Sequence, residues 1–454
     1  MNKLNIISLI LVIFIIVNNL QCQTITFEYL LSSPENEIIN DVYETADGII
    51  YTGGFSTKPN EFKYKASGLV LKIDNTGLLI DSNIININNR RYCINNIMPE
   101  EGIDQYVVAG YISDTLNGWP NNANISISLK RLNNNLEVIS EKEYVFPPEY
   151  GYWNMLTRRG NNNDLLIGGS VMRTTSIPTI FLYVVNEQFD SIKAKIYNDT
   201  TATRTCYGIK QINDTLYWVI DGLLPDYYLA DNDLNMTRYG YSVPHWINAP
   251  YGIKWDTDTS FYLTGEWNEQ PDDDIGFFKQ FHPIDSTGNL FNTWGTLDTL
   301  DLPAAWDALD YKNKDSIFIG GTTNVWATYY GTWPSWYFII QTDSMLNVRW
   351  ERFYGGDAYY VMQKIIAAND GGCIVAGTRY DYQNTTEEEL DIHILELNNE
   401  GLLVGTDDKP ALEMHEALVF PNPGSSYLRV RVAAQYKQST FMLYDISGKQ
   451  VLSQ

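Results

Sequence analysis

The 454-residue sequence predicts an all-β fold, a seven-bladed β-propeller of four-stranded blades followed by a small, incomplete β-sandwich. Three observations lead to this prediction. Apolar runs that end in glycine recur seven times, several strand-like segments occur in each repeat unit, and the signal for helices is poor. A period near 50 residues with several strands per unit indicates a propeller or a solenoid, and four strands per unit favour the propeller.

The glycine-ended runs are four to six residues long, rich in Ile, Val, Tyr and Phe, and bounded by Asp, Asn, Gly and Ser, as is typical of strands. We expect them to be the innermost strands of the blades, where a residue without Cβ lets neighbouring blades approach each other. The glycines that end them are Gly54, Gly110, Gly169, Gly222, Gly265, Gly321 and Gly377.

The other strands of each unit follow in a constant order. An extended segment such as 361–368 precedes each glycine-ended run, and a second apolar strand follows it, with 227–234 as the weakest copy. The N-terminal segment 25–31 is similar to 347–356, so we expect it to open the first blade; pairing with the last blade as a latch remains the alternative. The segment 401–406 is predicted as a final strand.

The first 22 residues have the features of an export signal, which places the protein outside the cell or on its outer surface. Lys3 precedes an apolar stretch at 6–17, and cleavage is expected near Cys22, which could alternatively carry a lipid. No later apolar run is long enough to cross a membrane. The chain has 31 basic and 55 acidic residues, a formal charge of -24, which argues against nucleic acid or an anionic membrane as the main partner.

No motif in the sequence carries recognisable catalytic chemistry, so we predict no catalytic residue and no cofactor apart from a candidate calcium site. Cys93, Cys206 and Cys373 are far apart and odd in number, which permits a disulfide after export without requiring one. Cys373 lies in an apolar strand pattern and is expected in the core. The histidines form no metal-binding pattern, and His393, between two isoleucines of a strand, is expected to be structural.

An aromatic segment at 326–336 is the candidate ligand-binding loop, because exposed aromatic rings stack on sugars or contact proteins. Its residues are Trp326, Tyr329, Tyr330, Trp333 and Trp336. Packing between blades is the alternative role for these side chains.

The segment 266–274 holds five carboxylates and is expected to form a loop after an inner strand. Clustered oxygen ligands suit calcium, and Asp272, Asp273 and Asp274 are the candidate ligands. A solvated acidic loop is the alternative, because the spacing matches no EF-hand.

The repeats resemble those of secreted bacterial propeller proteins. The similarity spans about 25–406 and is clearest in WERFYGG (350–356), in DGGCIVAG (370–377) and in LVLKIDNTG (69–77). Kelch repeats share the paired glycines but not this spacing of Tyr and Trp, and the Asp boxes of sialidases are absent.

After a polar linker at 407–414, the segment 415–454 resembles the type A C-terminal sorting domain of type IX secretion cargo, a small β-sandwich. The similarity rests on the alternating segment 427–432 and on Pro421, Asn422, Pro423, Tyr444, Asp445, Gly448 and Lys449. It implies the type IX secretion machinery as a partner. The family usually continues with a further strand and a basic tail, so the domain is expected to be truncated at Gln454.

The sequence therefore predicts an exported propeller, 23–406, that binds a protein or glycan without catalysis. The alternative is an extracellular polysaccharide lyase or glycosidase with its site in the central channel. An enzyme requires acid and base groups that converge near the axis with shifted pKa values, whereas a binding protein requires an apolar or aromatic patch on one face.

Overall fold

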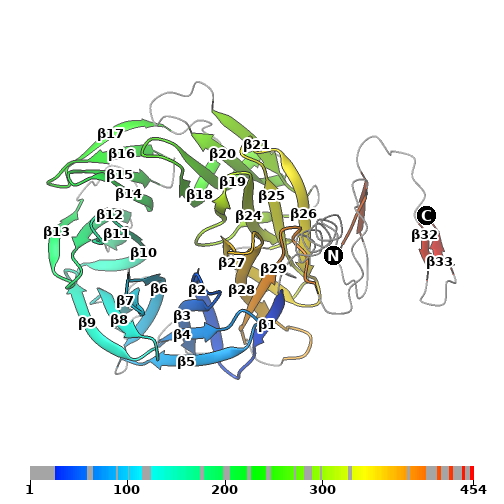
Figure 1. The fold of residues 1–454 in the computed structure, drawn as a ribbon, viewed down its shortest axis with the longest axis horizontal. Coiled ribbons are helices and arrows are strands. Elements are labelled where there is room, and N and C mark those ends of the chain that lie inside the picture. The colour runs from blue at the N-terminus through cyan, green and yellow to red at the C-terminus, as the bar shows by residue number, and fades with distance from the viewer. Residues whose placement is uncertain are drawn as a thin grey trace, which may run out of the picture.

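The computed structural model describes residues 26–58, 65–87, 90–100, 102–114, 124–173, 178–197, 205–221, 226–241, 247–269, 272–280, 289–296, 299–325, 330–385, 389–404, 417–420, 429–432, 442–444 and 450–453. Every regular element in these residues is a β-strand. Seven sheets stand around a central axis in a closed ring (Figure 1), which confirms the predicted seven-bladed propeller.

The first three blades are antiparallel four-stranded sheets whose strands follow one another in chain order from the axis outward. Blade 1 contains β2 (Asn36–Glu44), β3 (Ile50–Thr57), β4 (Ser67–Ile73) and β5 (Leu79–Ile85). Blade 2 contains β6 (Arg91–Pro99), β7 (Gln105–Ser113), β8 (Ser126–Asn133) and β9 (Val138–Val145). Blade 3 contains β10 (Tyr150–Arg159), β11 (Leu165–Arg173), β12 (Pro178–Val185) and β13 (Ser191–Ile196).

Blades 4 and 5 repeat this order, and the inner strand of blade 6 is divided into two short strands that both pair with β24. Blade 4 contains β14 (Cys206–Asn213), β15 (Leu216–Asp221), β16 (Asp226–Ala230) and β17 (Met236–Tyr241). Blade 5 contains β18 (Ile247–Trp255), β19 (Phe261–Glu269), β20 (Asp272–Gln280) and β21 (Leu290–Trp294). Blade 6 contains β22 (Asp301–Pro303), β23 (Leu309–Asn313), β24 (Ser316–Thr323), β25 (Trp336–Thr342) and β26 (Val348–Gly355).

The first strand of the chain completes the last blade. Blade 7 contains β27 (Tyr359–Ala367), β28 (Cys373–Tyr380) and β29 (Asp391–Leu397), and β1 (Phe27–Leu31) pairs with β29 as its outermost strand. The expectation that this segment opens the first blade is therefore wrong, and the latch alternative is correct. The predicted strand at 401–406 is also wrong for its described residues 401–404, whose Val404 exchanges hydrogen bonds with Thr26 instead.

The glycine-ended strands lie second from the axis, which corrects the prediction that they are innermost. In blade 1 the innermost strand is β2, and its register against β3 shifts between Ile39 and Asp41, which is a β-bulge. A Cβ added to Gly54 would overlap the carbonyl oxygen of Ile38 in this bulged segment. The glycine is therefore required by close backbone approach within one blade. The same overlap with the adjacent inner strand occurs at Gly110, Gly169, Gly321 and Gly377.

Residues in the turns between third and fourth strands connect neighbouring blades through packing and hydrogen bonds. In four blades such a turn holds a buried Leu or Phe in the left-handed region, where a residue other than glycine is strained. Burial of the apolar side chain offsets this strain. The preceding blade donates a hydrogen bond to the carbonyl oxygen of the same residue, from Asn83 to Leu136, Tyr144 to Phe189, Tyr197 to Leu234 and Asn292 to Leu346.

The structure also describes three cysteines and four short strands of the C-terminal segment. Cys93, Cys206 and Cys373 are buried free thiols, and Cys373 is a core residue as predicted. In the C-terminal segment, β30 (Ala417–Phe420) pairs with β31 (Arg429–Val432), and β32 (Met442–Tyr444) pairs with β33 (Gln450–Ser453). The residues that the structure describes include no helix that is long and apolar enough to span a membrane. The export signal and the linker lie outside the described residues.

Gly54→Ala is expected to lower the free energy of unfolding by about 2–3 kcal/mol, because the new methyl group forces β2 and β3 apart. Gly102→Ala is the control: an added Cβ meets nothing within 4 Å there, and only the positive φ opposes the change. It should cost about 1–2 kcal/mol. Chemical denaturation measures both variants, and equal losses would contradict the steric explanation.

Phe27→Ala is expected to cost about 3 kcal/mol or more, because Phe27 is buried in the seam between β1 and blade 1, where its ring lies against Gly77. Leu30→Ala on the same strand is the matched control, since its side chain is largely exposed and its loss should be small. Limited proteolysis should release the N-terminal segment faster from the Phe27 variant alone. Indistinguishable proteolysis of both variants would show that β1 does not hold the ring closed.

Candidate functional site

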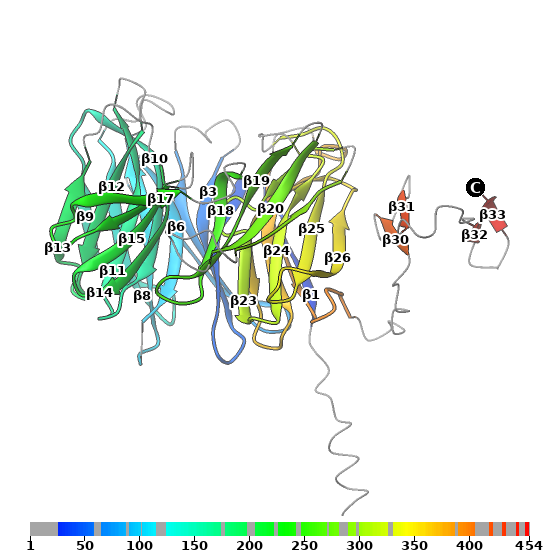
Figure 2. The same ribbon diagram turned by 90° about the horizontal axis from the view of Figure 1, so that it is seen from above.

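The channel holds a pocket of about 290 Å³ at the end where the inner strands finish. Each inner strand runs toward the face that carries the turns between first and second strands; we call this the turn face, and the opposite one the loop face (Figure 2). Six blades line the pocket, and blade 4 does not. Its lining is Asp41–Tyr43, Ile97–Pro99, Thr157–Arg159, Ile253, Lys254, Asp307, Leu309, Asp310 and Lys364–Ile366.

The β-bulges put polar side chains at the axis. Asp41, Asn96 and Lys364 occupy the same register position in three blades, because each is the first paired residue after the bulge of its inner strand. Asp41 and Lys364 are both buried, at 4% and 8% exposure. In these three blades the bulge therefore brings a polar side chain to the axis.

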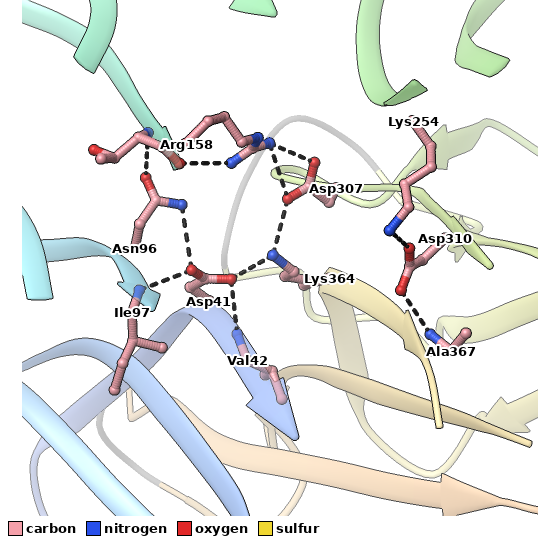
Figure 3. A network of polar contacts seen from close by, with 11 residues as sticks. Asp41, Val42, Asn96, Ile97, Arg158, Lys254, Asp307, Asp310, Lys364 and Ala367 are labelled. Carbon is pink, nitrogen blue, oxygen red and sulfur yellow. Dashed lines mark hydrogen bonds and ion pairs between the residues drawn. The ribbon is translucent and has the colours of Figure 1, made fainter. Parts of the chain in front are cut away.

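Four charged side chains bridge the channel in a continuous network (Figure 3). The Lys364 ammonium lies between two carboxylates, bonded to Asp41 and 2.8 Å from Oδ2 of Asp307. Arg158 Nη2 lies 3.0 Å from Oδ1 of the same Asp307. Because Arg158 comes from blade 3 and Asp307 from blade 6, this ion pair connects opposite sides of the ring.

Hydrogen bonds close the network into a loop. The Asn96 amide donates to Asp41 at 3.3 Å, and its oxygen accepts the backbone N–H of Thr157 at 2.8 Å. Thr157 precedes Arg158, so the contacts return to the arginine through blades 1, 2 and 3. A separate ion pair beside the loop joins Lys254 to Asp310 at 2.6 Å.

Ion pairing in the network favours the charged forms of Asp307 and Lys364. Burial alone would raise the pKa of Asp307, but Arg158 and Lys364 outweigh this effect and hold the pKa below its usual value. Burial would lower the pKa of Lys364, but Asp307 and Asp41 raise it instead. Both shifts move these groups away from the range in which they would exchange protons near neutral pH.

Carboxyl groups with pKa values closer to neutral lie outside the pocket lining. Burial raises the pKa of Glu37 to about 7, of Asp391 to about 6 and of Glu396 to about 8. Glu37 lies on β2 of blade 1, whereas the other two lie on β29 of blade 7. All three therefore belong to the two blades that meet where the ring closes. Since their folded-state pKa values are raised, each destabilises the fold as the pH rises from its ordinary pKa through the raised one.

The described part of the aromatic segment, 330–336, lies on the loop face, because it leads into the third strand of blade 6 from the side where the second strand ends. Trp336 belongs to β25 and is 3% exposed. The half-buried Trp333 donates its indole N–H to the Asn324 carbonyl at 2.9 Å, and Tyr330 packs edge-on against Tyr380. Trp326 and Tyr329 lie outside the described residues. The structure thus separates this segment from the channel pocket, and ligand binding by it stays a prediction.

The acidic segment forms part of a β-hairpin, so the prediction of a loop is wrong. Asp272, Asp273 and Asp274 begin β20 and pair with Glu269, Asn268 and Trp267 of β19. The positions of their side chains are outside the description. Among the described residues, no group of three or more His, Cys, Asp or Glu side chains is arranged to hold a metal ion. Calcium binding by the three aspartates stays a prediction.

His393 has the structural role expected for it. Its Nε2 lies 2.8 Å from Glu28 on β1, so the buried imidazole helps to attach the latch strand. Of the sorting-motif residues, Tyr444 lies in β32. Pro421, Asn422, Pro423, Asp445, Gly448 and Lys449 lie outside the described residues.

The sequence matches no protein-family profile, and no curated protein is similar to it by sequence. Solved structures of similar shape include virginiamycin B lyase from Staphylococcus aureus, with 12% identity, a TM-score of 0.44, and coverage of 82% of this chain and 99% of that one. A polysaccharide lyase, ulvan lyase, has 10% identity, a TM-score of 0.45, and coverage of 83% and 98%. A Bacteroides caccae protein of unknown function has 10% identity, a TM-score of 0.39, and coverage of 70% and 93%. Such distant similarity assigns no residue role.

Sequence reasoning did not identify the network residues Asp41, Arg158, Asp307 and Lys364. A signal for two of them is present, because charged side chains interrupt apolar runs in IINDVYE (38–44) and VMQKIIAA (361–368). A charge inside an otherwise buried strand needs a buried partner. Nothing in the sequence indicates which partner, since Lys364 and Asp41 are 323 positions apart.

Lys364→Met is expected to lower the free energy of unfolding at pH 7 by about 3–5 kcal/mol, because it leaves Asp41 and Asp307 buried without their shared cation. The lowered pKa of Asp307 means that its stabilising effect exists above its unfolded pKa and is lost as the pH falls through the folded value. The difference between wild type and variant should therefore shrink in acid. Lys210→Met, which removes a partly exposed pair with Asp258, should cost about 1 kcal/mol or less.

Denaturation of the three proteins at a series of pH values tests this account. A Lys364→Met variant as stable as Lys210→Met, or a difference that grows on acidification, would contradict it.

Proposed function

We propose that this protein is an exported, non-catalytic binding protein that presents a face of its propeller to a protein or glycan. The observation that supports the proposal is the channel pocket, in which charged groups are fixed by mutual pairing. A pre-ordered set of charged groups suits recognition, because little side-chain freedom is lost when a ligand binds.

The pKa shifts in the network favour binding over proton transfer. A general acid or base works best when its pKa is near the working pH. Asp307 has its pKa lowered and Lys364 has its pKa raised, so neither gains or loses a proton readily at neutral pH. The carboxyl groups whose pKa values approach neutrality, Glu37 and Glu396, do not line the pocket.

The second candidate is a polysaccharide lyase or glycosidase acting in the channel. It is favoured by the convergence of Asp41, Asp307, Arg158 and Lys364 at the axis, which is the kind of arrangement expected of an enzyme. The distinction between the candidates is chemical: an enzyme leaves its glycan cleaved, and a binding protein releases it intact.

The proposed location and partners follow from both ends of the chain. We assign residues 1–22 to an export signal and 415–454 to a type IX sorting domain, which makes the type IX secretion machinery the proposed partner during export. The mature protein would then act in the extracellular medium or at the outer cell surface, with the aromatic segment on the loop face as a second proposed contact surface.

Screening the full chain against an array of acidic and neutral glycans and of extracellular proteins tests the function. We expect saturable binding of at least one ligand, and we expect mass spectrometry to recover a bound glycan intact after prolonged incubation. Trp333→Ala reports on the aromatic segment, since binding through the loop face should weaken in this variant. New reducing ends or unsaturated sugars would instead establish the enzyme, and an array without any saturable ligand would remove support for both candidates.

A further inference from the structure

The carboxylates of the channel pocket have acceptor positions occupied by the protein itself. Asp41 accepts four hydrogen bonds, from the backbone N–H groups of Val42 and Ile97, from the Asn96 amide and from Lys364. A carboxylate offers about four such positions, so Asp41 is saturated. Asp310 has one partner on each oxygen, Lys254 and the backbone N–H of Ala367, so about half of its acceptor positions are occupied.

The cations of the pocket retain donors. An ammonium group has three N–H donors, and Lys254 has Asp310 as its ion-pair partner. Arg158 has five donors and makes three hydrogen bonds with them, two to Asp307 and one to the carbonyl oxygen of the neighbouring Thr157. The side chains of Lys254 and Arg158 are 43% and 35% exposed, whereas the side chains of Asp307 and Asp310 are at most 17% exposed. The groups that a ligand meets first are therefore cationic donors.

The charge of the lining supports the same conclusion. Arg158, Arg159, Lys254 and Lys364 outnumber the three lining carboxylates Asp41, Asp307 and Asp310 by one, and Arg159 also pairs with Glu100, just outside the lining, at 4.0 Å. The complete chain has a formal charge of -24, so this nearly neutral site is a local exception to the charge of the molecule. A concave site with low-dielectric walls focuses the field of such groups and attracts ions of opposite charge.

We propose that the channel pocket binds the carboxylate of an acidic sugar, with Lys254 and Arg158 as the donors to it. The volume of about 290 Å³ is at the small end for ligand pockets and suits one sugar unit. The apolar lining residues, such as Met98, Ile253 and Ile366, provide walls for the ring. This assignment rests on the proposed binding function and specifies the ligand class for the pocket.

Calorimetric titration of the full chain with sodium glucuronate and with neutral methyl glucoside tests the assignment. Glucuronate is expected to bind at least about tenfold more tightly, and its affinity should fall as salt is added, because the contact is between charges. Lys254→Met should weaken glucuronate binding about tenfold or more, whereas Lys254→Arg, which keeps the charge, should retain most of it.

Lys210→Met is the matched control. Lys210 pairs with Trp218 in blade 4 in the same register as Lys254 with Tyr262 in blade 5, and it does not line the pocket. Its replacement should leave glucuronate affinity unchanged. Circular dichroism of each variant verifies that the propeller is folded, and both lysines are partly exposed, so neither substitution empties the core.

Several results would overturn the assignment: absence of glucuronate binding to the folded wild type, equal affinity for the neutral glycoside, or equal losses in the Lys254 and Lys210 variants. Equal affinity for N-acetylglycine would overturn the choice of a sugar, since the pocket would then recognise any small carboxylate. If the glycan array yields a ligand whose binding is insensitive to Lys254→Met, the proposed binding function stands and the pocket assignment fails.

Discussion

The ion network from Asp41 through Lys364 and Asp307 to Arg158 is the interaction on which the organisation of this propeller depends. Charges removed from water are costly unless they are paired and fully hydrogen-bonded. Each member of the network comes from a different blade, so the charges are satisfied when blades 1, 3, 6 and 7 hold their places around the axis. The central charges are therefore paired only when the ring is closed.

Two features that recur in several blades, one near the axis and one at the outer edge, support this arrangement. The bulge in the inner strand turns a polar residue toward the axis, and the glycine opposite it provides the space that the bulged carbonyl group needs. At the outer side of four blades, a buried turn residue such as Leu346 accepts a hydrogen bond from the preceding blade. These contacts hold the blades rigidly both near the axis and at the outer edge. The connecting loops can therefore vary in sequence, and binding residues are commonly found on such loops.

Much of the fold could be predicted from the sequence, because the spacing of the glycines counts the blades. A glycine indicates close approach of another backbone but does not say whether that backbone belongs to the same blade, which is why the inner strand was misassigned. The similarity of segment 25–31 to 347–356 was informative: β26 is the outermost strand of blade 6, and β1 is the outermost strand of blade 7. Since blade 1 already ends in β5, an outermost strand at the start of the chain belongs to the last blade.

The candidate site could not be predicted from the sequence, for a different reason. The aromatic segment stands out by its composition, yet Trp336 is part of a buried strand, and the described residues 330–336 lie on the face opposite the pocket. The pocket residues come from six different blades, and their contacts become apparent only when the closed ring brings positions such as Asp41 and Lys364 together. Composition identifies a local concentration of one residue type, whereas a channel site is assembled from single residues of many repeats.

The pairing of β1 with β29 has a consequence for biosynthesis. Thr26 and Val404, which are bonded to each other beside this pair of strands, are 378 positions apart. β1 is therefore synthesised long before β29 and can pair with it only after blade 7 has been synthesised. Until then a nascent chain carries an open array of blades with an unsatisfied edge at each end, and such edges pair readily with other chains. The termini of this propeller thus make the completed polypeptide, rather than any single blade, the unit that folds.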